Sequence, residues 1–201
     1  MASISNKAQQ MPASAIRKLV PMADAAKKQG VKVYHLNLGQ PDIKSPACAL
    51  DAIKNFSAEN VSYSHSAGLM DLRKGLVEKY YKKIGIDITV DELIVTVAGS
   101  ESVNLALEIA CNPGDEVIVL EPFYTNYNTF AFMNGLTLKA IPTDIRNGFQ
   151  IPPIEEFEKA ITDKTKAILV CNPGNPTGTQ YSKESMLALG EIARKHDLFL
   201  L

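Results

Sequence analysis

Residues 167–179 combine a run of apolar side chains with a polar loop rich in proline and glycine. Their sequence is AILVCNPGNPTGT, and an amphipathic segment follows from Ser182. Because proline fixes φ and X-Pro bonds become cis at low cost, the two Asn-Pro steps can hold an asparagine amide in one orientation. A continuously apolar strand is typical of a parallel sheet covered on both faces, and such sheets bind ligands at the carboxyl ends of their strands. The segment predicts either a ligand-binding loop between strand and helix or a plain connector whose breakers end the strand.

A second strand-to-helix turn lies earlier in the chain. Residues 93–97 (LIVTV) are mostly apolar and are followed by residues 98–102 (AGSES), after which apolar residues recur at helical spacing. The first turn of a helix has free backbone N–H groups and the positive end of the helix dipole. The turn therefore predicts an anion site, although the same residues also suit an ordinary N-cap.

The elements that must position these turns alternate along the chain. Strand-like composition occurs at residues 33–38, 93–97, 116–120, 136–142, 166–171 and 197–201. Helical spacing or helix start signals occur at residues 15–29, 45–56, 69–80, 103–111, 154–161 and 182–196. This alternation predicts an α/β fold with a mainly parallel sheet covered by helices.

The overall composition is that of an ordinary globular protein. The 201 residues are 46% hydrophobic and 21% charged, with a net charge of -1, enough for one good core. No basic patch indicates nucleic acid, no apolar run approaches the ~20 residues of a membrane helix, and the N-terminus has no signal-peptide core. We therefore expect a cytoplasmic protein without a nucleic-acid or membrane partner. Cys48, Cys111 and Cys171 fit neither a zinc pattern nor a disulfide framework, so we expect buried thiols and no metal.

The polar loop resembles a known family signature. Residues 172–178, NPGNPTG, resemble the N-P-x-N-P-T-G segment of the class I and II aminotransferases, which are pyridoxal-phosphate enzymes of fold type I. The resemblance implies that Asn175 hydrogen-bonds the phenolic oxygen of the cofactor. It also implies a cis bond before Pro176 and a second cis bond between Glu121 and Pro122.

The turn at residues 98–102 is similar to the G-[ST]-x turn that cradles the cofactor phosphate in this family. The resemblance assigns phosphate binding to Gly99, Ser100, Glu101 and Ser102. Because a carboxylate repels phosphate, we expect Glu101 to contribute its backbone N–H and to point its carboxylate away.

Residues 121–127, EPFYTNY, resemble the family's P-x-[WY]-x-x-Y segment, in which the aromatic residue two positions after the proline stacks on the pyridine ring. That residue is Tyr124, and such stacking is worth ~0.5–1.5 kcal/mol beyond burial. The alternative is an aromatic cluster that fills the core, which we prefer for Phe123 and Phe130. Since all three turns follow predicted parallel strands, we expect them to converge at one edge of the sheet.

Two segments nearer the N-terminus also resemble the family. Residues 38–42, LGQPD, resemble the L-x-x-G-x-P-D segment, whose glycine, here Gly39, lies beside the substrate; a turn glycine is the alternative. Residues 63–73 resemble Y-x-x-x-x-G-x-x-x-L-R, which implies that Tyr63 reaches across a dimer interface to the phosphate of the other subunit. A packing tyrosine is the alternative there.

The resemblance also divides the chain. Residues 1–13 are expected to be an arm on a partner subunit, or disordered, residues 14–45 a contribution to a small domain, and residues 46–201 the first part of the cofactor-binding large domain. In the family, the acidic partner of the pyridine nitrogen, the covalent lysine and the carboxylate-binding arginine all follow the strand that begins at residues 197–201. We therefore expect the N-terminal half of a family member, inactive alone.

The expected activity of the whole protein is amino transfer from an α-amino acid, aspartate-type or of broad specificity, to a 2-oxo acid by a pyridoxal-phosphate-dependent homodimer. Cysteine-sulfur lyases and related fold-type-I enzymes share much of the signature and remain an alternative. A non-catalytic anion-binding α/β domain is the other alternative. Against a nucleotide-binding domain, the chain has neither a G-x-x-x-x-G-K-[ST] loop nor a G-x-G-x-x-G turn after a strand.

Overall fold

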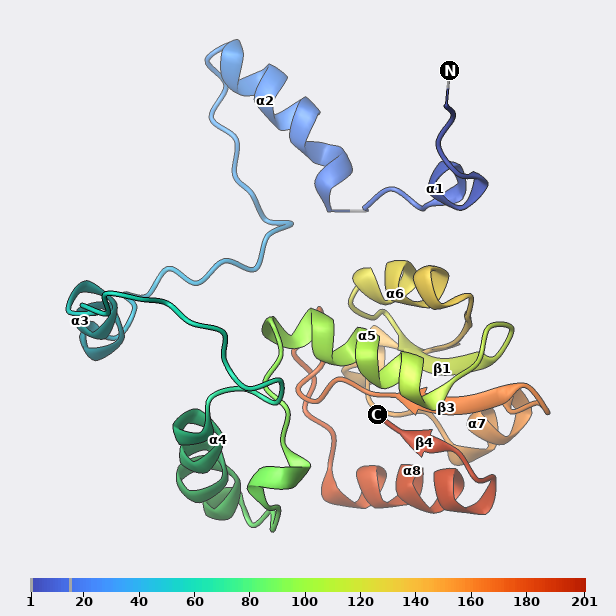
Figure 1. Ribbon diagram of the computed structural model, residues 1–201. Helices are drawn as coiled ribbons and strands as arrows, with labels where there is room; N and C mark the ends of the chain where they lie inside the picture. The colour runs from blue at the N-terminus through green and yellow to red at the C-terminus, as the bar shows by residue number, and fades with distance from the viewer. Residues whose placement is uncertain (1, 15) are drawn as a thin grey trace. The chain divides into compact units, whose positions relative to one another are not determined.

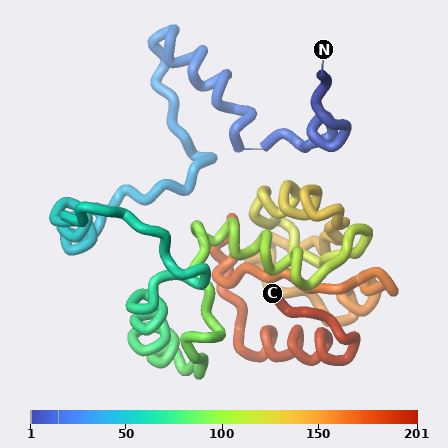
Figure 2. The backbone as a smooth tube through the Cα atoms, in the orientation of Figure 1, coloured from blue at the N-terminus to red at the C-terminus, as the bar shows by residue number. Residues whose placement is uncertain are grey.

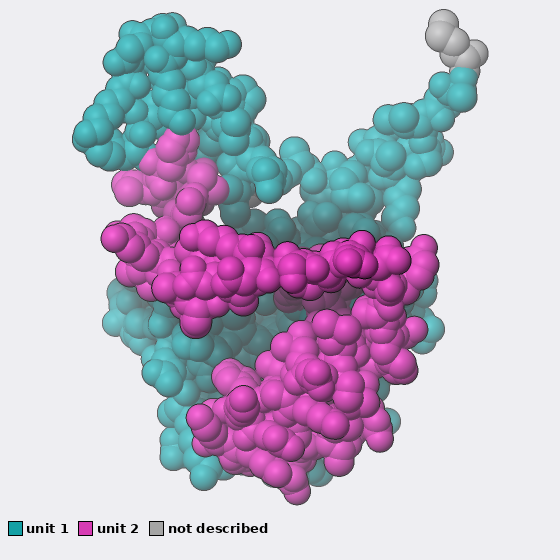
Figure 3. All heavy atoms as spheres, turned by 60° about the vertical axis from the view of Figure 1, so that its left-hand side comes forward, with its two compact units in different colours: residues 1–34, 102–201 teal, residues 35–101 magenta. Residues whose placement is uncertain are grey.

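The computed structural model describes residues 2–14 and 16–201. These residues form two compact units, coloured separately in Figure 3. The sheet unit comprises the residues up to 34 together with residues 102–201, and the helical unit comprises residues 35–101. Met1, in the predicted arm, and Ala15, in the first predicted helix, lie outside the described residues.

The sheet unit is built on four strands that all run parallel. They are β1 (Glu116–Glu121), β2 (Thr137–Pro142), β3 (Thr165–Leu169) and β4 (Phe199–Leu200). Their order is β2-β1-β3-β4, with β4 beside β3 near the C-terminus (Figure 2). The chain thus moves outward from β1 first to one side and then to the other, which makes the boundary between β1 and β3 a topological switch point. The expected α/β fold with a parallel sheet is confirmed.

Helices cover both faces of this sheet (Figure 1). One face packs against α5 (Ala98–Ala110) and α6 (Asn126–Asn134), and the other against α7 (Ile154–Ala160) and α8 (Lys183–Lys195). Because successive side chains of a strand point to opposite faces, Val117 and Val119 enter the first core while Ile118 and Leu120 enter the second. Burial on both faces explains why β1 is continuously apolar in sequence.

Local sequence sets the ends of these helices. At the start of α8, the Ser182 hydroxyl accepts a hydrogen bond of 3.1 Å from the Ser185 N–H, an ordinary N-cap. At the end of α6, Gly135 adopts the left-handed conformation with φ 70°, which glycine adopts without steric cost. Among the described residues, no helix is long and apolar enough to cross a membrane.

The N-terminal segment of the sheet unit is helical in two places. A short α1 (Asn6–Gln10) lies within the predicted arm, and a 3₁₀ turn (Arg17–Leu19) leads into α2 (Val20–Lys28), which confirms the predicted helix from residue 17 onward. The strand expected at residues 33–38 is wrong. This segment is not paired into the sheet, and its Leu36 side chain is 95% exposed.

The helical unit, which ends in the first turn of α5, contains two complete α-helices and several shorter turns. These are α3 (Ala47–Lys54), α4 (Met70–Leu76) continuing through a π-helical turn (Val77–Tyr81), and 3₁₀ turns at Lys82–Ile84 and Val90–Glu92. The buried Arg73 of α4 joins two of these elements. Its guanidinium donates to the Leu93 carbonyl at 3.0 Å and to the Val90 carbonyl, and lies 3.7 Å from the Asp91 carboxylate.

The strand expected at residues 93–97 is also wrong. Leu93 is extended, with φ -121° and ψ 124°, and the Val95 N–H donates to the Ala67 carbonyl at 3.0 Å. A strand also needs a neighbour that continues the ladder, and the sheet among the described residues places none beside this segment.

The cysteines differ in burial. Cys111 is buried and Cys171 is half-buried, but Cys48 is exposed, so the expectation of buried thiols is wrong for Cys48. The reason is its position in α3, a helix with no buried residue.

Candidate functional site

A small cavity of about 20 Å³ lies where β1 and β3 end, at the topological switch point. The loops that follow these two strands supply most of its wall. Its lining includes Phe123, Tyr127, Cys171, Gly174, Asn175 and Tyr181. The sequence therefore brings its polar loop and its aromatic segment to one edge of the sheet, as predicted for these two turns.

The loop after β3 is tightly folded. The Gly174 N–H donates to the Thr179 carbonyl at 2.7 Å, and the Gly178 N–H donates to the Gly174 carbonyl at 2.8 Å. A Cβ atom on Gly174 would lie 2.6 Å from the Thr177 hydroxyl oxygen, so a side chain there would force the loop open. The turn thus holds Asn175, the predicted cofactor ligand, against the cavity.

Further contacts anchor the same loop to its surroundings. The Asn172 side-chain oxygen accepts from the Tyr181 N–H at 3.0 Å, and the buried Thr179 hydroxyl donates to the Gly148 carbonyl at 2.7 Å. The bonds before Pro176 and Pro122 are cis, which confirms both expectations. The bond before Pro173 is cis as well, which the sequence did not predict.

The aromatic segment after β1 forms an ordered stack. Tyr127 is buried and lies parallel to Phe123 with ring centroids 6.1 Å apart. Tyr124 meets Tyr127 edge-on at 5.6 Å and 87°, and its hydroxyl oxygen accepts a hydrogen bond of 2.7 Å from the Asn126 amide. Phe123 and Phe130 pack against the core, as expected for those two.

The surroundings of Tyr127 raise the pKa of its phenol. Burial, followed by the neighbouring Cys171 thiol and the Tyr124 phenol, raises the pKa of Tyr127 to about 12. A tyrosine with its ordinary pKa of 10 is already neutral at physiological pH, so the raised pKa leaves this residue of the cavity wall uncharged.

The predicted phosphate turn begins α5, but it follows an extended segment rather than a strand of the sheet. The expected position of this turn, directly after a parallel strand of the sheet, is therefore wrong. Gly99, Ser100 and Glu101 end the helical unit and Ser102 begins the next stretch of the sheet unit; all four are exposed. The Glu101 carboxylate accepts a hydrogen bond from the Val97 backbone N–H.

Gly39 and Tyr63 lie in the helical unit. In the part of the chain that the structure describes, neither has packing contacts like those that Tyr124 makes with Tyr127 and Asn126. Tyr63 is fully exposed, and a Cβ atom on Gly39 would meet open space. No steric requirement of the described residues therefore explains a glycine at position 39.

Comparison with known proteins identifies the family. The sequence pattern of "Aminotransferase class I and II" matches residues 31–201, which is most of the chain. The chain belongs to the class I and II aminotransferase family.

Individual family members support this assignment. The aspartate/prephenate aminotransferase of Thermus thermophilus is 35% identical over all of this chain, which covers 52% of that protein. The solved structure of an alanine aminotransferase from Pyrococcus furiosus is 35% identical, with a TM-score of 0.88 over 98% of this chain and 51% of that chain. An aspartate aminotransferase from Thermotoga maritima is 30% identical and superposes with a TM-score of 0.89 over 98% of this chain and 52% of that chain. The chain spans about half the length of the curated relatives it matches.

Within this family context, sequence reasoning missed two features of the site. Asn126 occupies an unspecified position of the P-x-[WY]-x-x-Y segment, so the motif gave no reason to single it out, although its amide binds Tyr124. The helix α6 that begins at Asn126 was also missed, because the aromatic residues at its start were interpreted as a cluster rather than as a helix.

Proposed function

We propose that this chain carries the first part of the cofactor site of a pyridoxal-phosphate-dependent aminotransferase. The whole protein would move an amino group from an α-amino acid, aspartate-type or of broad specificity, to a 2-oxo acid, as a cytoplasmic homodimer. The observation that best supports the proposal is the position of the cavity. It lies at the switch point between β1 and β3, with Asn175 in its wall and Tyr124 packed against the wall residue Tyr127.

The donor set fits this cofactor. Pyridoxal phosphate offers a flat ring, a phenolic oxygen and a phosphate, and the chain offers the aromatic face of Tyr124, the amide of Asn175 and the first turn of the 13-residue helix α5. A cavity of about 20 Å³ does not enclose a pyridine ring, so the fit depends on these groups and not on volume.

Each predicted site residue has a role in the proposal. Tyr124 would stack on the ring, and Asn175 would donate to the phenolic oxygen. Backbone N–H groups and hydroxyls at residues 99–102 would hold the phosphate, while the bond from Val97 occupies the Glu101 carboxylate. Tyr63 would reach the phosphate of the partner subunit, and Gly39 would lie beside the substrate.

When bound, the cofactor supplies the electron sink for the bond changes at the amino acid's α-carbon. The residues of this chain orient it. Tyr127, which stacks on Phe123, packs edge-on against the Tyr124 ring, and the tight turn at Gly174 fixes the backbone that carries Asn175.

The division of the chain belongs to the same proposal. Residues 1–13 would form an arm on the partner subunit, residues 14–45 would contribute to a small domain, and residues 46–201 would belong to the large domain. The short α1 within the arm shows that these residues can take up regular structure.

Cofactor titration tests the proposal directly. We expect the 201-residue chain to bind pyridoxal phosphate weakly and saturably, as followed by its absorption spectrum, and Tyr124→Ala and Asn175→Ala each to weaken binding by roughly fivefold, the value of one ordinary contact. Phe56→Ala, which alters an exposed aromatic residue, is the matched control. Borohydride reduction and peptide mapping should show no single lysine labelled stoichiometrically. Equal affinity of the wild type and both site variants would overturn the proposal.

A further inference from the structure

We propose that Asn126 is a positioning residue for Tyr124. Its side-chain amide donates a hydrogen bond of 2.7 Å to the Tyr124 hydroxyl oxygen, from the first residue of α6. The effect on the cofactor rests on the proposed function, because it assumes that the Tyr124 ring faces pyridoxal phosphate. The effect on the ring itself is independent of any ligand.

The hydrogen bond completes the fixation of the Tyr124 ring. The hydroxyl oxygen of a tyrosine lies on the axis through Cβ and Cγ, so a hydrogen bond to it fixes the direction of that axis and not the rotation of the ring about it. This torsion is broad in tyrosine. Tyr127, itself buried against Phe123, restricts the rotation by packing edge-on with ring centroids 5.6 Å apart. Asn126 holds the axis at the hydroxyl, so the two contacts together define the position and the plane of the ring.

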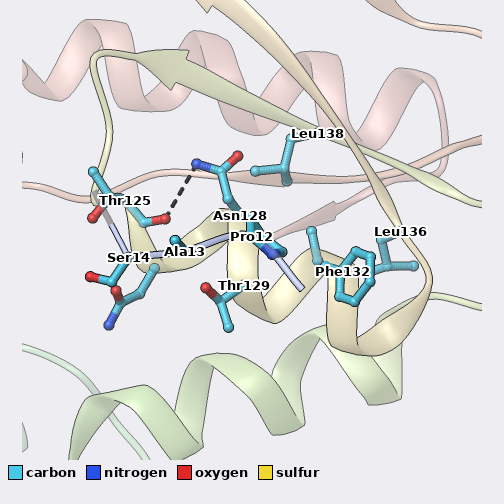
Figure 4. A pocket seen from close by; sticks show the side chains of 11 residues that line it. Pro12, Ala13, Ser14, Thr125, Asn128, Thr129, Phe132, Leu136 and Leu138 are labelled. Atoms are coloured by element: carbon cyan, nitrogen blue, oxygen red, sulfur yellow. Dashed lines mark hydrogen bonds between the residues drawn. The ribbon is translucent and has the colours of Figure 1, made fainter. Parts of the chain in front are cut away.

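Asn126 is itself attached to a rigid element. As the first residue of α6, it moves with a helix whose Tyr127 and Ala131 side chains are buried in the core of the sheet unit. Its side chain also lines a cavity of about 390 Å³ between residues 12–14, α6 and β2, shown in Figure 4. The residues that line this cavity carry no charge, so no ionic partner there competes for the Asn126 amide.

The chain offers a matched control two residues further along the same helix. Asn128 also lines the 390 Å³ cavity, but its amide donates to the Thr125 carbonyl at 3.3 Å, the dashed line in Figure 4, and not to Tyr124. Asn126→Ala and Asn128→Ala therefore make the same chemical change on the same helix. Only the first removes a contact to the proposed stacking residue.

A measurement without cofactor tests the positioning role. The whole chain is labelled with 3-fluorotyrosine, and the ¹⁹F resonance of Tyr124 is assigned from its loss in Tyr124→Phe. We expect Asn126→Ala, and the nearly isosteric Asn126→Leu, to shift and broaden this resonance, while Asn128→Ala leaves it in place. An unchanged Tyr124 resonance in folded Asn126→Ala, or an equal change in Asn128→Ala, would overturn the proposal.

A double-mutant cycle tests the consequence for the cofactor. We expect Asn126→Ala to weaken binding of pyridoxal phosphate by roughly three- to fivefold, in line with one hydrogen bond, and to have no further effect in a Tyr124→Phe background. Equal losses in both backgrounds would contradict the coupling. If Tyr124→Ala itself leaves the affinity unchanged, the stacking role under the proposed function fails, whereas the fluorine measurement still decides whether Asn126 orients the ring.

Discussion

Tyr124 and Tyr63 show how differently the two units hold residues with related predicted roles. Tyr124 lies in the sheet unit, where it contacts Tyr127 and accepts a hydrogen bond from Asn126. Tyr63 lies in the helical unit and is fully exposed. A residue in the loop after a strand of a covered sheet is held in place because that strand is packed in the core of the same unit. Tyr63 makes no such contact among the described residues, and its role at a partner subunit stays a prediction.

The two units also differ in how many side chains they bury. The sheet unit buries side chains on both faces of its sheet, with Phe157, Ile118 and Leu107 fully inaccessible. Within residues 35–101, the buried residues are Val77 and the charged Arg73. The sheet unit is therefore stabilised chiefly by apolar burial, and the helical unit depends more on a few polar contacts.

The largest expected effect comes from comparing one phenylalanine in each unit. Phe157 of α7 is fully buried against the sheet, whereas Phe56 is 66% exposed. We expect Phe157→Ala to lower the free energy of unfolding by about 3–5 kcal/mol, because it leaves a cavity in the core. Phe56→Ala should have little effect. Urea denaturation followed by circular dichroism measures both, and equal losses would refute the contrast.

A second prediction concerns the polar contacts of the helical unit. Arg73→Ala removes the guanidinium that donates to the Leu93 and Val90 carbonyls. We expect the free energy of unfolding to fall by about 1.5–3 kcal/mol. The readout is hydrogen exchange of the backbone amides at residues 90–97, which should become faster. The exposed Lys74 on the same helix provides the control Lys74→Ala, for which exchange should not change.

Asp91→Ala tests which contact of Arg73 matters. The Asp91 side chain is 90% exposed and lies 3.7 Å from the guanidinium, so water screens the pair and its removal should cost little. A loss as large as that of Arg73→Ala would mean that the ion pair, and not the hydrogen bonds to the backbone, holds this turn.

The contrast also explains what the sequence could predict of the fold. Strands β1 and β3 were located to within a residue or two, because burial on both faces leaves a nearly continuous apolar run. The edge strand β2 was located as closely from its strand-like composition, although only Ile141 in it is buried. The strands expected at residues 33–38 and 93–97 were wrong for a physical reason. Composition shows that a segment can be extended, but it does not show whether a neighbouring strand is there to pair with it.

The candidate site was predictable where it depends on motifs and not where it depends on single contacts. Tyr124 and Asn175 follow β1 and β3 as expected, because the carboxyl ends of parallel strands share one edge. Asn126 was not predictable, since an asparagine two residues after a tyrosine is an ordinary helix-start residue until the structure shows its amide on the hydroxyl.

A third prediction examines a turn of the helical unit. Gly68 has φ 97°, and a Cβ atom there would lie 2.6 Å from the Val95 Cβ. We expect Gly68→Ala to destabilise the protein by about 1–2 kcal/mol from the left-handed backbone alone, with the clash adding to it. Gly75 in α4 has open space around its Cβ position, so Gly75→Ala should be neutral or stabilising. Thermal unfolding of both variants measures the difference. A loss confined to about 1–2 kcal/mol would mean that the Val95 segment moves aside, and a Gly68→Ala variant as stable as the wild type would contradict the left-handed conformation at this position.

The smallest expected effect concerns an ionic contact within the sheet unit. The Glu158 carboxylate of α7 accepts from Lys195 at 2.6 Å and lies 2.7 Å from His196 Nε2, which joins α7 to the end of α8. The Lys195 hydrogen bond, helped by His196, lowers the pKa of Glu158 below its ordinary value of 4.5. A carboxyl group with a lowered pKa stabilises the folded state above its ordinary pKa, and this contribution disappears as the pH falls through the lowered value. We therefore expect Glu158→Gln to unfold at lower urea concentration than the wild type at pH 7, and this gap to shrink progressively as the pH is lowered below 4.5. Glu155→Gln, on the same helix, is the control. Because the Lys195 side chain is 64% exposed and water screens its charge, the gap at pH 7 should be small, and a gap that persists at low pH would show that Glu158 acts through packing and not through its charge.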